Sequence, residues 1–277
     1  MVEGERTSAS TAGPLRPTWL DCRLSTVEEH LALDEALLDM AHEGESRMTC
    51  VRSWMAAEPV VVLGSSSRCA EEVDFEACRR HGVRVVRRPS GGATVVLGPG
   101  CVMWSVIEHH PQGPPPIEAI HAAMLEPLAA ALNEALARAG RAEGGRVARR
   151  GTSDLALLAG GGASQPDLPV APADDLKVSG NALRVRRHGV LYHGTLLDTF
   201  DLDLVGRVLK HPPREPEYRG RRPHAAFLAN LGLGRAVLET AIRTAFGAVE
   251  PAGDWPADRV ARLVRDRYAA ADWTERL

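Results

Sequence analysis

The sequence predicts an α+β domain in which mixed or antiparallel β-sheets are flanked by helices. Three observations support this fold class: short apolar runs rich in Val, Ile and Leu recur, amphipathic helical patterns separate them, and glycine-rich turns follow several of them. With 277 residues, 44% hydrophobic and 25% charged, the chain has the composition of a folded globular protein. Residues 1–16, rich in Ser, Thr, Gly and Glu, are expected to form a disordered leader, and residues 17–277 the folded domain.

The N-terminal half contains a capped helix followed by several short strands. Thr26 precedes acidic residues in a first helical turn, and Gly44 fits the end of that helix. A Gly-Pro-Gly turn at 98–100 separates two apolar runs and predicts a hairpin. The expected elements are helices over 27–41 and 73–81, and strands over 48–54, 59–63, 83–87, 94–97 and 102–107.

The C-terminal half begins with a long Ala- and Leu-rich helix that carries Pro127, where we expect a kink. A Gly-, Pro- and Ala-rich stretch over 159–175 separates two strands and is expected to be a mobile loop, either a plain insertion or a lid over a ligand. The expected elements are a helix over 117–139, strands over 146–158, 176–187 and 190–197, loops and helices over 206–250, and an amphipathic helix over 256–268.

Charge and hydropathy exclude several functional classes. A formal net charge of -3 argues against a surface built to bind nucleic acid. No apolar run reaches the roughly 18–20 residues that span a bilayer, and the N-terminus lacks the basic-then-apolar order of an export signal. We therefore expect a cytoplasmic protein that binds neither nucleic acid nor membranes.

Cysteine and lysine usage both carry information. The five cysteines all lie within the first 101 residues and form no C-x-x-C pair, so neither disulfides nor a metal cluster is expected. The 33 basic residues comprise 31 Arg and two Lys, Lys177 and Lys210. A lysine that survives such a strong bias toward Arg marks a position where Arg does not serve, and this singles out Lys177.

The first motif that carries chemistry runs from Arg87 to Thr94. Gly91 and Gly92 let the backbone approach a ligand and present N–H groups to an anion. Arg87 and Arg88 add permanent positive charge for a phosphate or carboxylate. The alternative interpretation, about equally favoured by the motif alone, is a tight hairpin with surface arginines.

Two further motifs lie on C-terminal strands. Lys177, followed by Ser-Gly-Asn, places an ammonium beside small polar groups, and Asp154 on a neighbouring strand would hold it or help bind a metal-bridged phosphate. The alternative is an exposed lysine at a strand end. His193 and Gly194 interrupt an apolar strand, where glycine indicates close approach of a ligand or backbone, although His193 alone fits a hydrogen-bonded core residue.

Taken together and in this order, the three motifs closely resemble those of the lipoate/octanoate-protein ligase and transferase family, within the biotin/lipoate protein ligase superfamily. The resemblance covers roughly residues 20–275 and implies a catalytic domain of that fold, without a separate C-terminal accessory domain. The matching residues are Arg87, Arg88, Ser90, Gly91 and Gly92 in the loop, Lys177, Ser179, Gly180 and Ala182 in the lysine strand, and His193, Gly194 and Thr195 in the last motif, with Trp54 and Gly64 as weaker matches.

The resemblance implies that the enzyme activates lipoate or octanoate with ATP and Mg²⁺ to an acyl-adenylate and transfers the acyl group to a lysine of an acceptor domain. Lys177 would be the catalytic residue, because a compact ammonium reaches both the phosphate and the carbonyl oxygen. An acyl tunnel would be lined by Trp54, Val62 and Gly64. The implied adenylate-binding residues are Arg87, Arg88, Ser90, Gly91, Gly92, Ala93, Asp154, Ser179, Gly180, Ala182, His193, Gly194 and Thr195.

The resemblance also implies partners. The acceptor would be a lipoyl domain, such as that of a 2-oxoacid dehydrogenase E2, or a glycine cleavage H-like protein. No fixed metal site is implied: Mg²⁺ would arrive with the ATP phosphates, with Asp154 as the candidate protein ligand. Either a separate accessory subunit assists adenylation or the reaction proceeds without one. The basic stretch 218–224 would dock an acidic acceptor, or is a solvated loop.

Two alternatives stay open. An octanoyltransferase would take octanoate from acyl carrier protein without ATP, through a nucleophilic cysteine. In the family that the chain resembles, this cysteine lies shortly before the lysine strand or well after it. The chain has no cysteine at those positions, which leaves Cys101 as the candidate. The best support for a non-catalytic lipoate-binding protein is Leu97-Gly98, where many members have His-Asp, whereas Lys177, Asp154 and the glycine loop count against it. Biotin ligation is disfavoured because the Gly-Arg-Gly-Arg type of loop is missing.

Overall fold

The structure, a computed structural model of the chain, describes residues 16–158 and 175–277. The predicted leader, except Arg16, and the predicted loop over 159–175, except Asp175, lie outside the described residues. The α+β class with mixed sheets and flanking helices is confirmed. None of the helices in the described ranges combines the length and apolarity needed to cross a bilayer.

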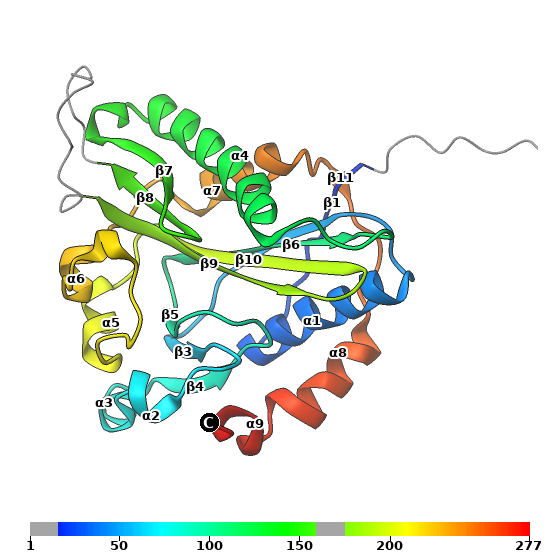
Figure 1. Cartoon of the computed structure of the whole chain (residues 1–277), viewed down its shortest axis with the longest axis horizontal. Coiled ribbons are helices and arrows are strands. Elements are labelled where there is room, and N and C mark those ends of the chain that lie inside the picture. The colour runs from blue at the N-terminus through cyan, green and yellow to red at the C-terminus, as the bar shows by residue number, and fades with distance from the viewer. Residues whose placement is uncertain (1–15, 159–174) are drawn as a thin grey trace, which may run out of the picture.

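Within the described residues, a large sheet of eight strands has the order β11-β1-β2-β6-β10-β9-β8-β7 (Figure 1). Its central strands β2, β6, β10, β9, β8 and β7 are antiparallel, whereas the short edge strands β1 and β11 add in parallel. The strands are β1 Thr18–Trp19, β2 Cys50–Trp54, β6 Cys101–His109, β7 Arg146–Arg150, β8 Asp154–Leu158, β9 Leu176–Val185, β10 Gly189–Leu197 and β11 Glu250–Pro251.

A smaller sheet packs below the large one in Figure 1 and consists, in the described chain, of β4 (Arg84–Arg87), β3 (Val60–Leu63) and β5 (Val95–Leu97). The expected hairpin between the runs at 94–97 and 102–107 is wrong. β5 pairs with β3 and β6 pairs with β2 and β10, so the Gly-Pro-Gly turn carries the chain from one sheet to the other. A turn signal between two apolar runs cannot distinguish these outcomes, because pairing depends on partners distant in sequence.

Helix α1 (Val27–Glu43) lies under the large sheet, on the same side as the small sheet. Its predicted start and end are confirmed: Thr26 and Glu29 form a reciprocal capping box, and Gly44 ends the helix with φ of 77°. Asp34 and Glu35 are nevertheless 0% and 1% exposed. A buried carboxylate is stable only when it is paired or hydrogen-bonded, so both side chains need polar partners inside the protein.

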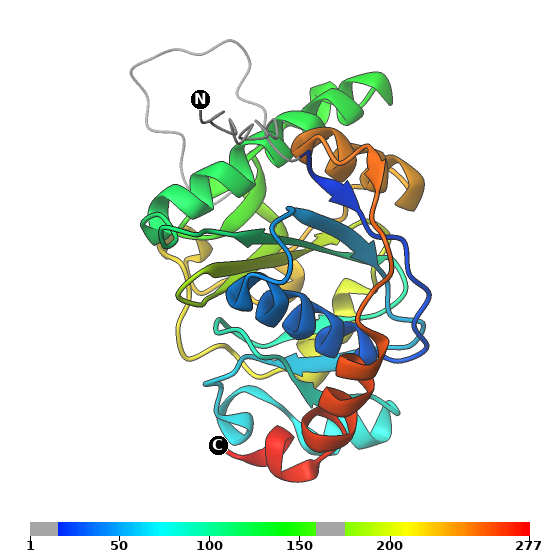
Figure 2. The ribbon, with the colours of Figure 1, turned by 90° about the vertical axis from the view of Figure 1, so that its right-hand side faces the viewer.

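Helices α4 (Ile117–Arg138) and α7 (Arg235–Phe246) cover the opposite face of the large sheet (Figure 2). Pro127, the residue at which a kink is expected, lies inside α4. Two main apolar cores follow from these layers. One core lies between the two sheets and α1, and the other lies between the large sheet and α4 with α7.

Two further predictions were wrong in their element boundaries. The helix expected over 73–81 is the shorter α3 (Phe75–Arg80), because Asp74 caps its start by accepting a hydrogen bond from the Ala77 amide at 2.8 Å. The strand expected over 146–158 is the hairpin β7–β8, with Gly151 in the turn at φ of 54°. The remaining helices are α2 Cys69–Glu72, α3 Phe75–Arg80, η1 Ala142–Gly144, α5 Leu202–Val208, η3 Glu217–Arg219 and α6 His224–Phe227.

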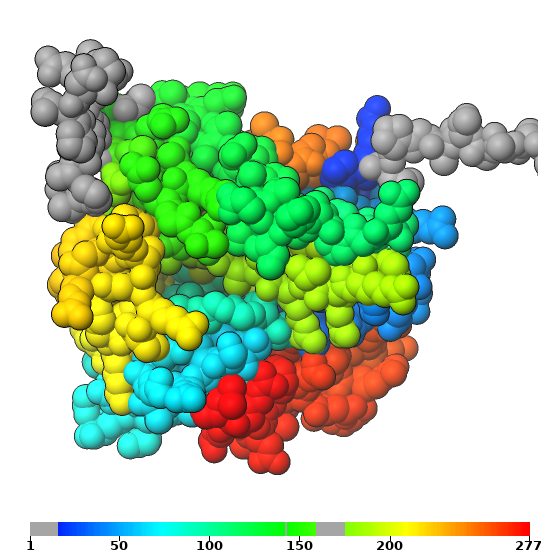
Figure 3. Space-filling model, viewed as in Figure 1, coloured from blue at the N-terminus to red at the C-terminus, as the bar shows by residue number. Residues whose placement is uncertain are grey.

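The C-terminal segment returns to the small sheet as α8 (Ala257–Leu263), η4 (Val264–Tyr268) and α9 (Ala271–Glu275). The helix predicted over 256–268 therefore ends in the wider π-helical turn η4. Figure 3 shows the end of this segment (red) lying directly against the segment that contains α2 (cyan), where the Cys69 amide donates to the Leu277 carbonyl at 3.2 Å. The chain's last described residues thus pack beside its first Gly-rich motif.

Candidate active site

Lys177 lies in β9 beside a β-bulge that decides where its side chain points. Consecutive residues of β8 pair with Ser179 and Lys177, so Val178 is an extra residue in β9. An extra residue reverses the alternation of side chains along the strand, which brings Lys177 onto the same face as Gly180. A Cβ built on Gly180 would lie 2.9 Å from Lys177 Nζ, so glycine leaves the space that the ammonium occupies.

The Lys177 ammonium is held by a carboxylate. Its Nζ lies 2.8 Å from Asp154 Oδ1, and the side chains are 24% and 11% exposed. The Tyr218 hydroxyl donates to the other oxygen, Asp154 Oδ2, at 2.9 Å. Burial, followed by the negative charge of Asp154, raises the pKa of Tyr218, so the hydroxyl remains a donor. The ammonium is therefore oriented but still accessible to an anionic ligand.

The glycine-rich loop after β4 is built around the Arg88 guanidinium. Its Nη2 donates to the carbonyls of Gly91 at 2.6 Å and Ala93 at 2.9 Å, and its Nη1 donates to Val62 at 3.2 Å. Its Nε donates to Ser90 Oγ at 3.1 Å. Burial lowers the pKa of Arg88 to about 10, which leaves it charged at neutral pH. Arg88 thus shapes the loop from inside.

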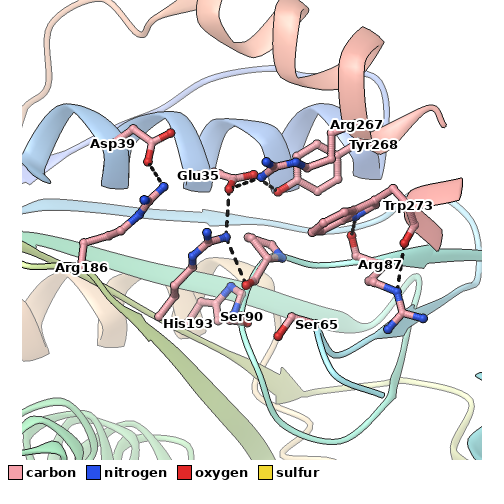
Figure 4. Close-up of polar contacts among 12 residues, drawn as sticks. Glu35, Asp39, Ser65, Arg87, Ser90, Arg186, His193, Arg267, Tyr268 and Trp273 are labelled. Atoms are coloured by element: carbon pink, nitrogen blue, oxygen red, sulfur yellow. Dashed lines mark hydrogen bonds and ion pairs between the residues drawn. The ribbon is translucent and has the colours of Figure 1, made fainter. Parts of the chain in front are cut away.

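Arg87 is also used within the chain. It is fully buried and donates to the carbonyls of Gly64 at 2.7 Å, Ser67 at 2.8 Å, Trp273 at 3.1 Å and Thr274 at 2.8 Å. Figure 4 shows Arg87 facing Trp273 of the C-terminal segment. Both arginines therefore hold the loop in place, and their direct contact with an acyl-adenylate stays a prediction.

The loop tip meets the lysine strand. Gly92 has φ of 90°, and a Cβ built on it would lie 3.5 Å from the Cβ of Ala182 in β9. A Cβ on Gly64 would lie 2.0 Å from the Gly92 carbonyl oxygen, so the loop also packs tightly on β3. Among the described residues the amides of Gly91, Gly92 and Ala93 donate to no backbone or side-chain acceptor. Three consecutive unpaired N–H groups suit an anion.

Beneath this loop lies a buried polar chain. Ser90 Oγ is 2.5 Å from His193 Nε2, and His193 Nδ1 is 3.4 Å from Asp34 Oδ2. Asp34 also pairs with Arg52 at 2.5 Å and accepts hydrogen bonds from Ser105. Burial alone would raise the pKa of Asp34, but Arg52 and then His193 outweigh it and hold that pKa below its ordinary value. The carboxylate therefore stays charged inside the protein.

The remaining predicted residues of the strand pair divide between its two faces. Thr195 Oγ1 accepts a hydrogen bond from the Gly180 amide at 3.1 Å, on the face of Lys177. Ser179 donates to Asn181 Oδ1 at 3.2 Å, and a Cβ on Gly194 would lie 1.6 Å from that same oxygen. Ser179 and Gly194 thus accommodate Asn181 and bind the strands together.

The predicted tunnel residues belong to the core between the two sheets. Trp54 and Val62 are 2% and 1% exposed. Trp54 stacks on His30 with 4.3 Å between ring centroids, and among the described residues its indole N–H has no partner. The acyl tunnel therefore stays a prediction, placed where apolar side chains of both sheets meet.

Cys101 is the candidate nucleophile of the octanoyltransferase alternative, and the structure contradicts this role. Its side chain is fully buried in the apolar core between the sheets. Burial raises the pKa of the Cys101 thiol to about 12, so almost no thiolate exists at neutral pH. The sequence shows a cysteine directly after the Gly-Pro-Gly turn, but it does not show that the side chain of this residue in β6 points into the core.

A positively charged cleft of about 540 Å³ opens beside the loop, between β9 and the C-terminal segment. Three arginines line it, Arg184, Arg267 and Arg276, and Arg276 lies 3.9 Å from the ring centroid of Trp273. Glu35 pairs with Arg184 at 2.9 Å and also with Arg267, as Figure 4 shows for the latter. One carboxylate against three guanidinium groups leaves positive charge that attracts anions.

Two residues of this site have no role in the prediction from sequence. Tyr218 is 64 positions from its partner Asp154, and no local pattern links them. Asp34 carries the buried chain to His193, and its signal was available: an acidic residue inside an otherwise apolar helical stretch. A charge at a core-facing helical position predicts a buried partner, although it does not say which one.

The site fits phosphates better than a resident metal ion. Within the described ranges no three His, Cys, Asp or Glu side chains cluster at metal-binding distance. Asp154 already engages Lys177 and Tyr218 through both oxygens. Mg²⁺ commonly binds through one or two carboxylates together with substrate phosphates, so these side chains do not by themselves form a metal cage.

The fold and the three motifs define a class of acyl-transferring catalytic domain, and comparison with known proteins identifies it. Residues 26–237 match the family model described as lipoyl protein ligase A/B catalytic domain. The chain belongs to this family, which confirms the resemblance stated from its motifs.

Individual relatives carry two kinds of name. An octanoyltransferase LipM of Moorella thermoacetica is 30% identical over 276 residues, which are 94% of this chain and 98% of that protein. The bipartite lipoate protein ligase of Thermoplasma acidophilum, studied with its E2 lipoyl domain, superposes with a TM-score of 0.71 at 20% identity, over 95% of this chain and 97% of that one. A lipoate-protein ligase A bound with ATP gives 0.69 at 21% identity, over 94% and 99%. The structural matches establish the fold.

Proposed function

We propose that this chain is an ATP-dependent lipoate/octanoate-protein ligase that transfers the acyl group to a lysine of a lipoyl acceptor domain. The observation that carries the proposal is the Lys177 ammonium, held by Asp154 on the same sheet face as Gly180 and Ala182, where the glycine loop ends. A cation on the sheet face that the loop tip contacts, together with the unpaired amides of that loop, is suited to an activated carboxyl, where negative charge develops on oxygen.

Each part of the site has a task in this reaction. The amides of Gly91, Gly92 and Ala93 bind the α-phosphate of the nucleotide, and the arginine cleft attracts its charge. Mg²⁺ bound to the phosphates supplies further neutralisation of their charge. The Lys177 ammonium donates to the acyl carbonyl and the phosphate oxygen, stabilising charge when the carboxylate is activated and again when the acceptor amine displaces the phosphate.

The acyl chain lies between the two sheets in this proposal. That layer contains Trp54, Val62 and Leu197 among its apolar residues. Each buried methylene contributes about 0.8 kcal/mol, so a chain of octanoate length gains several kcal/mol from burial. This burial free energy favours the binding of medium-chain acids over short ones without any polar contact to the chain.

The acceptor domain docks at the outer edge of the site. The stretch that provides Tyr218 also carries Arg221, which is exposed and held in the left-handed region at φ of 58°. Arg222 is less available, since it donates to the carbonyls of Asp175 and Tyr218. An exposed guanidinium at the mouth favours an acidic partner.

A second candidate function is ATP-independent octanoyl transfer from acyl carrier protein. It is favoured by the relative named octanoyltransferase LipM, which is similar along nearly the whole chain. Cys101 is excluded as its nucleophile because it lies in the apolar core between the sheets, where desolvation raises the pKa of its thiol to about 12. The other four cysteines all precede the glycine loop in sequence. A transferase with this site needs another nucleophile or direct attack by the acceptor amine.

An assay with two donors separates the candidates. Purified protein and an apo lipoyl domain are incubated with octanoate or lipoate plus Mg-ATP, and separately with octanoyl-acyl carrier protein without ATP. We expect acylated acceptor and AMP in the first mixture. Product in the second mixture alone would replace the ligase assignment by the transferase, and product in neither would favour a lipoate-binding protein without catalytic activity.

A further inference from the structure

Ser90, His193 and Asp34 stand in the order and spacing of a nucleophilic triad. Ser90 Oγ lies 2.5 Å from His193 Nε2, and His193 Nδ1 lies 3.4 Å from Asp34 Oδ2. The three residues come from the glycine loop, β10 and α1, and they are 1%, 2% and 0% exposed. A hydroxyl, an imidazole and a carboxylate in this sequence form the arrangement that activates serine in acyl-transfer enzymes.

The neighbouring donors fix the direction of the protons. Arg88 Nε donates to Ser90 Oγ, so the hydroxyl proton is free to point toward His193 Nε2. Asp34 is held as an acceptor by Arg52 and Ser105, so the His193 Nδ1 that faces it is the donor of this pair. The imidazole then presents an unprotonated Nε2 to the serine, as a general base must.

Donors for an oxyanion follow the serine directly. The amides of Gly91, Gly92 and Ala93 are unpaired among the described residues, and Gly92 and Ala93 are exposed. Backbone N–H groups just after a nucleophile are a recurrent way to stabilise a tetrahedral oxyanion. The loop therefore contains both a nucleophile with its base and a place for the negative charge.

We propose that Ser90 is an acyl-accepting nucleophile, which lets this site use a medium-chain acyl thioester without ATP. In the first step Ser90 Oγ attacks the thioester carbonyl, His193 takes the hydroxyl proton and passes it to the leaving thiolate, and an octanoyl ester of Ser90 forms. In the second step the acceptor lysine amine attacks the ester, an amide forms, and the amine proton returns through His193 to Ser90. Asp34 is a positioning residue for His193.

The near-complete burial of Ser90 fits such an intermediate. An ester at a site that is 1% exposed is shielded from water, so aminolysis is favoured over hydrolysis. The loop tip packs against Ala182 of β9, so the loop must move away from this strand for an acyl chain to reach Ser90. The inference rests on the proposed function in one respect only, that the acceptor is a lysine of a lipoyl domain. The thioester step itself needs neither ATP nor Mg²⁺.

The test uses the full chain and octanoyl-pantetheine as the thioester, without ATP. We expect the intact mass to rise by one octanoyl group, mapped to Ser90, resistant to neutral hydroxylamine and removed by alkali, as for an oxygen ester. S90A removes the adduct and lowers ATP-independent transfer to an apo lipoyl domain by at least about 100-fold. S53A is the matched control and keeps the adduct, because Ser53 lies on β2 and bonds Glu239 instead.

The S90C variant tests whether the thioester reaches this position if Ser90 itself proves unreactive. A hydroxylamine-sensitive adduct on S90C together with none on the unaltered chain would show that the thioester reaches the position but that Ser90 is not a nucleophile, which overturns the inference. No adduct on either protein overturns it as well. Octanoate with Mg-ATP, run in parallel, reports the ligase reaction separately, so either proposal can fail while the other stands.

Discussion

At the scale of single residues, the site depends on one ammonium in a chain whose other basic side chains are almost all guanidinium groups. Lys177 is one of two lysines, and its partner Asp154 together with Gly180 leaves a space suited to a compact cation. Arg would need a wider space and would present a planar fork. The scarcity of lysine in the sequence and the space beside Gly180 therefore indicate the same residue.

Lys177→Arg is expected to lower ligase turnover by about 100- to 1,000-fold, because the charge is kept but displaced from the reacting oxygens. Single-turnover acylation of an apo lipoyl domain measures this. Lys210→Arg is the matched control: that amine donates to the Ala70 carbonyl on the surface, so activity should be unchanged. Full activity in Lys177→Arg would remove the role given to the ammonium.

Asp34→Asn is expected to destabilise the protein by about 3–5 kcal/mol at pH 7, since it leaves Arg52 buried without its counter-charge. The pKa of Asp34 is lowered in the folded state, so its contribution is complete above the unfolded value of about 3.9 and is lost as the pH falls below it. Urea unfolding at pH 7 and below pH 4 should show the difference between the two proteins shrinking with acid.

The control for that experiment is Glu134→Gln, which breaks an ion pair whose Arg138 and Glu134 side chains are 76% and 61% exposed. Exposed pairs contribute about 0–1 kcal/mol, so this variant should unfold almost like the unaltered chain. An Asp34→Asn effect no larger than that of the control would contradict the buried network.

At the scale of elements, local patterns predicted what lies within one strand or helix and failed where pairing is decided by distant segments. The capping of α1 and the apolar run of β3 were visible in sequence. The separation of β5 from β6 into different sheets was not, because a glycine turn permits both results. The bulge in β9 was also invisible, yet it directs Lys177 into the site.

Gly180→Ala tests the role of that strand geometry. The new methyl group would lie 2.9 Å from the Lys177 ammonium, so the flexible side chain must move away from Asp154. We expect a large loss of kcat with a change in unfolding free energy of no more than about 1 kcal/mol. Gly206→Ala in α5 is the control, because a Cβ there meets no atom within 4 Å. Equal kcat in both variants would show that the space at Gly180 is not needed.

At the scale of the whole molecule, the C-terminal segment ties the first helix and the glycine loop together. Tyr268 donates to Glu35 of α1 at 2.7 Å, and the indole N–H of Trp273 donates to the Arg87 carbonyl at 2.9 Å. These contacts join residues more than 180 positions apart. The positions of α1 and of the strand that leads into the glycine loop therefore depend on the C-terminal segment, which contains none of the three motifs.

Tyr268→Phe is expected to cost about 1.5–3 kcal/mol, because it removes a hydrogen bond to a buried carboxylate. Limited proteolysis should then cut the C-terminal segment faster. Tyr192→Phe deletes the same atom from a bond to His121 at 2.9 Å, under α4, and should leave that cleavage rate unchanged. Identical rates in both variants would contradict the tie between the segment and α1.

The most direct measurement is a crystal structure of the protein with octanoyl-sulfamoyl-adenosine, a stable analogue of the activated acid. We expect its sulfamate and carbonyl to lie between Lys177 Nζ and the amides of Gly91–Ala93, with the octanoyl chain between the two sheets. An analogue bound with Lys177 still directed only at Asp154 and far from the carbonyl, or with its chain outside the sheets, would contradict it.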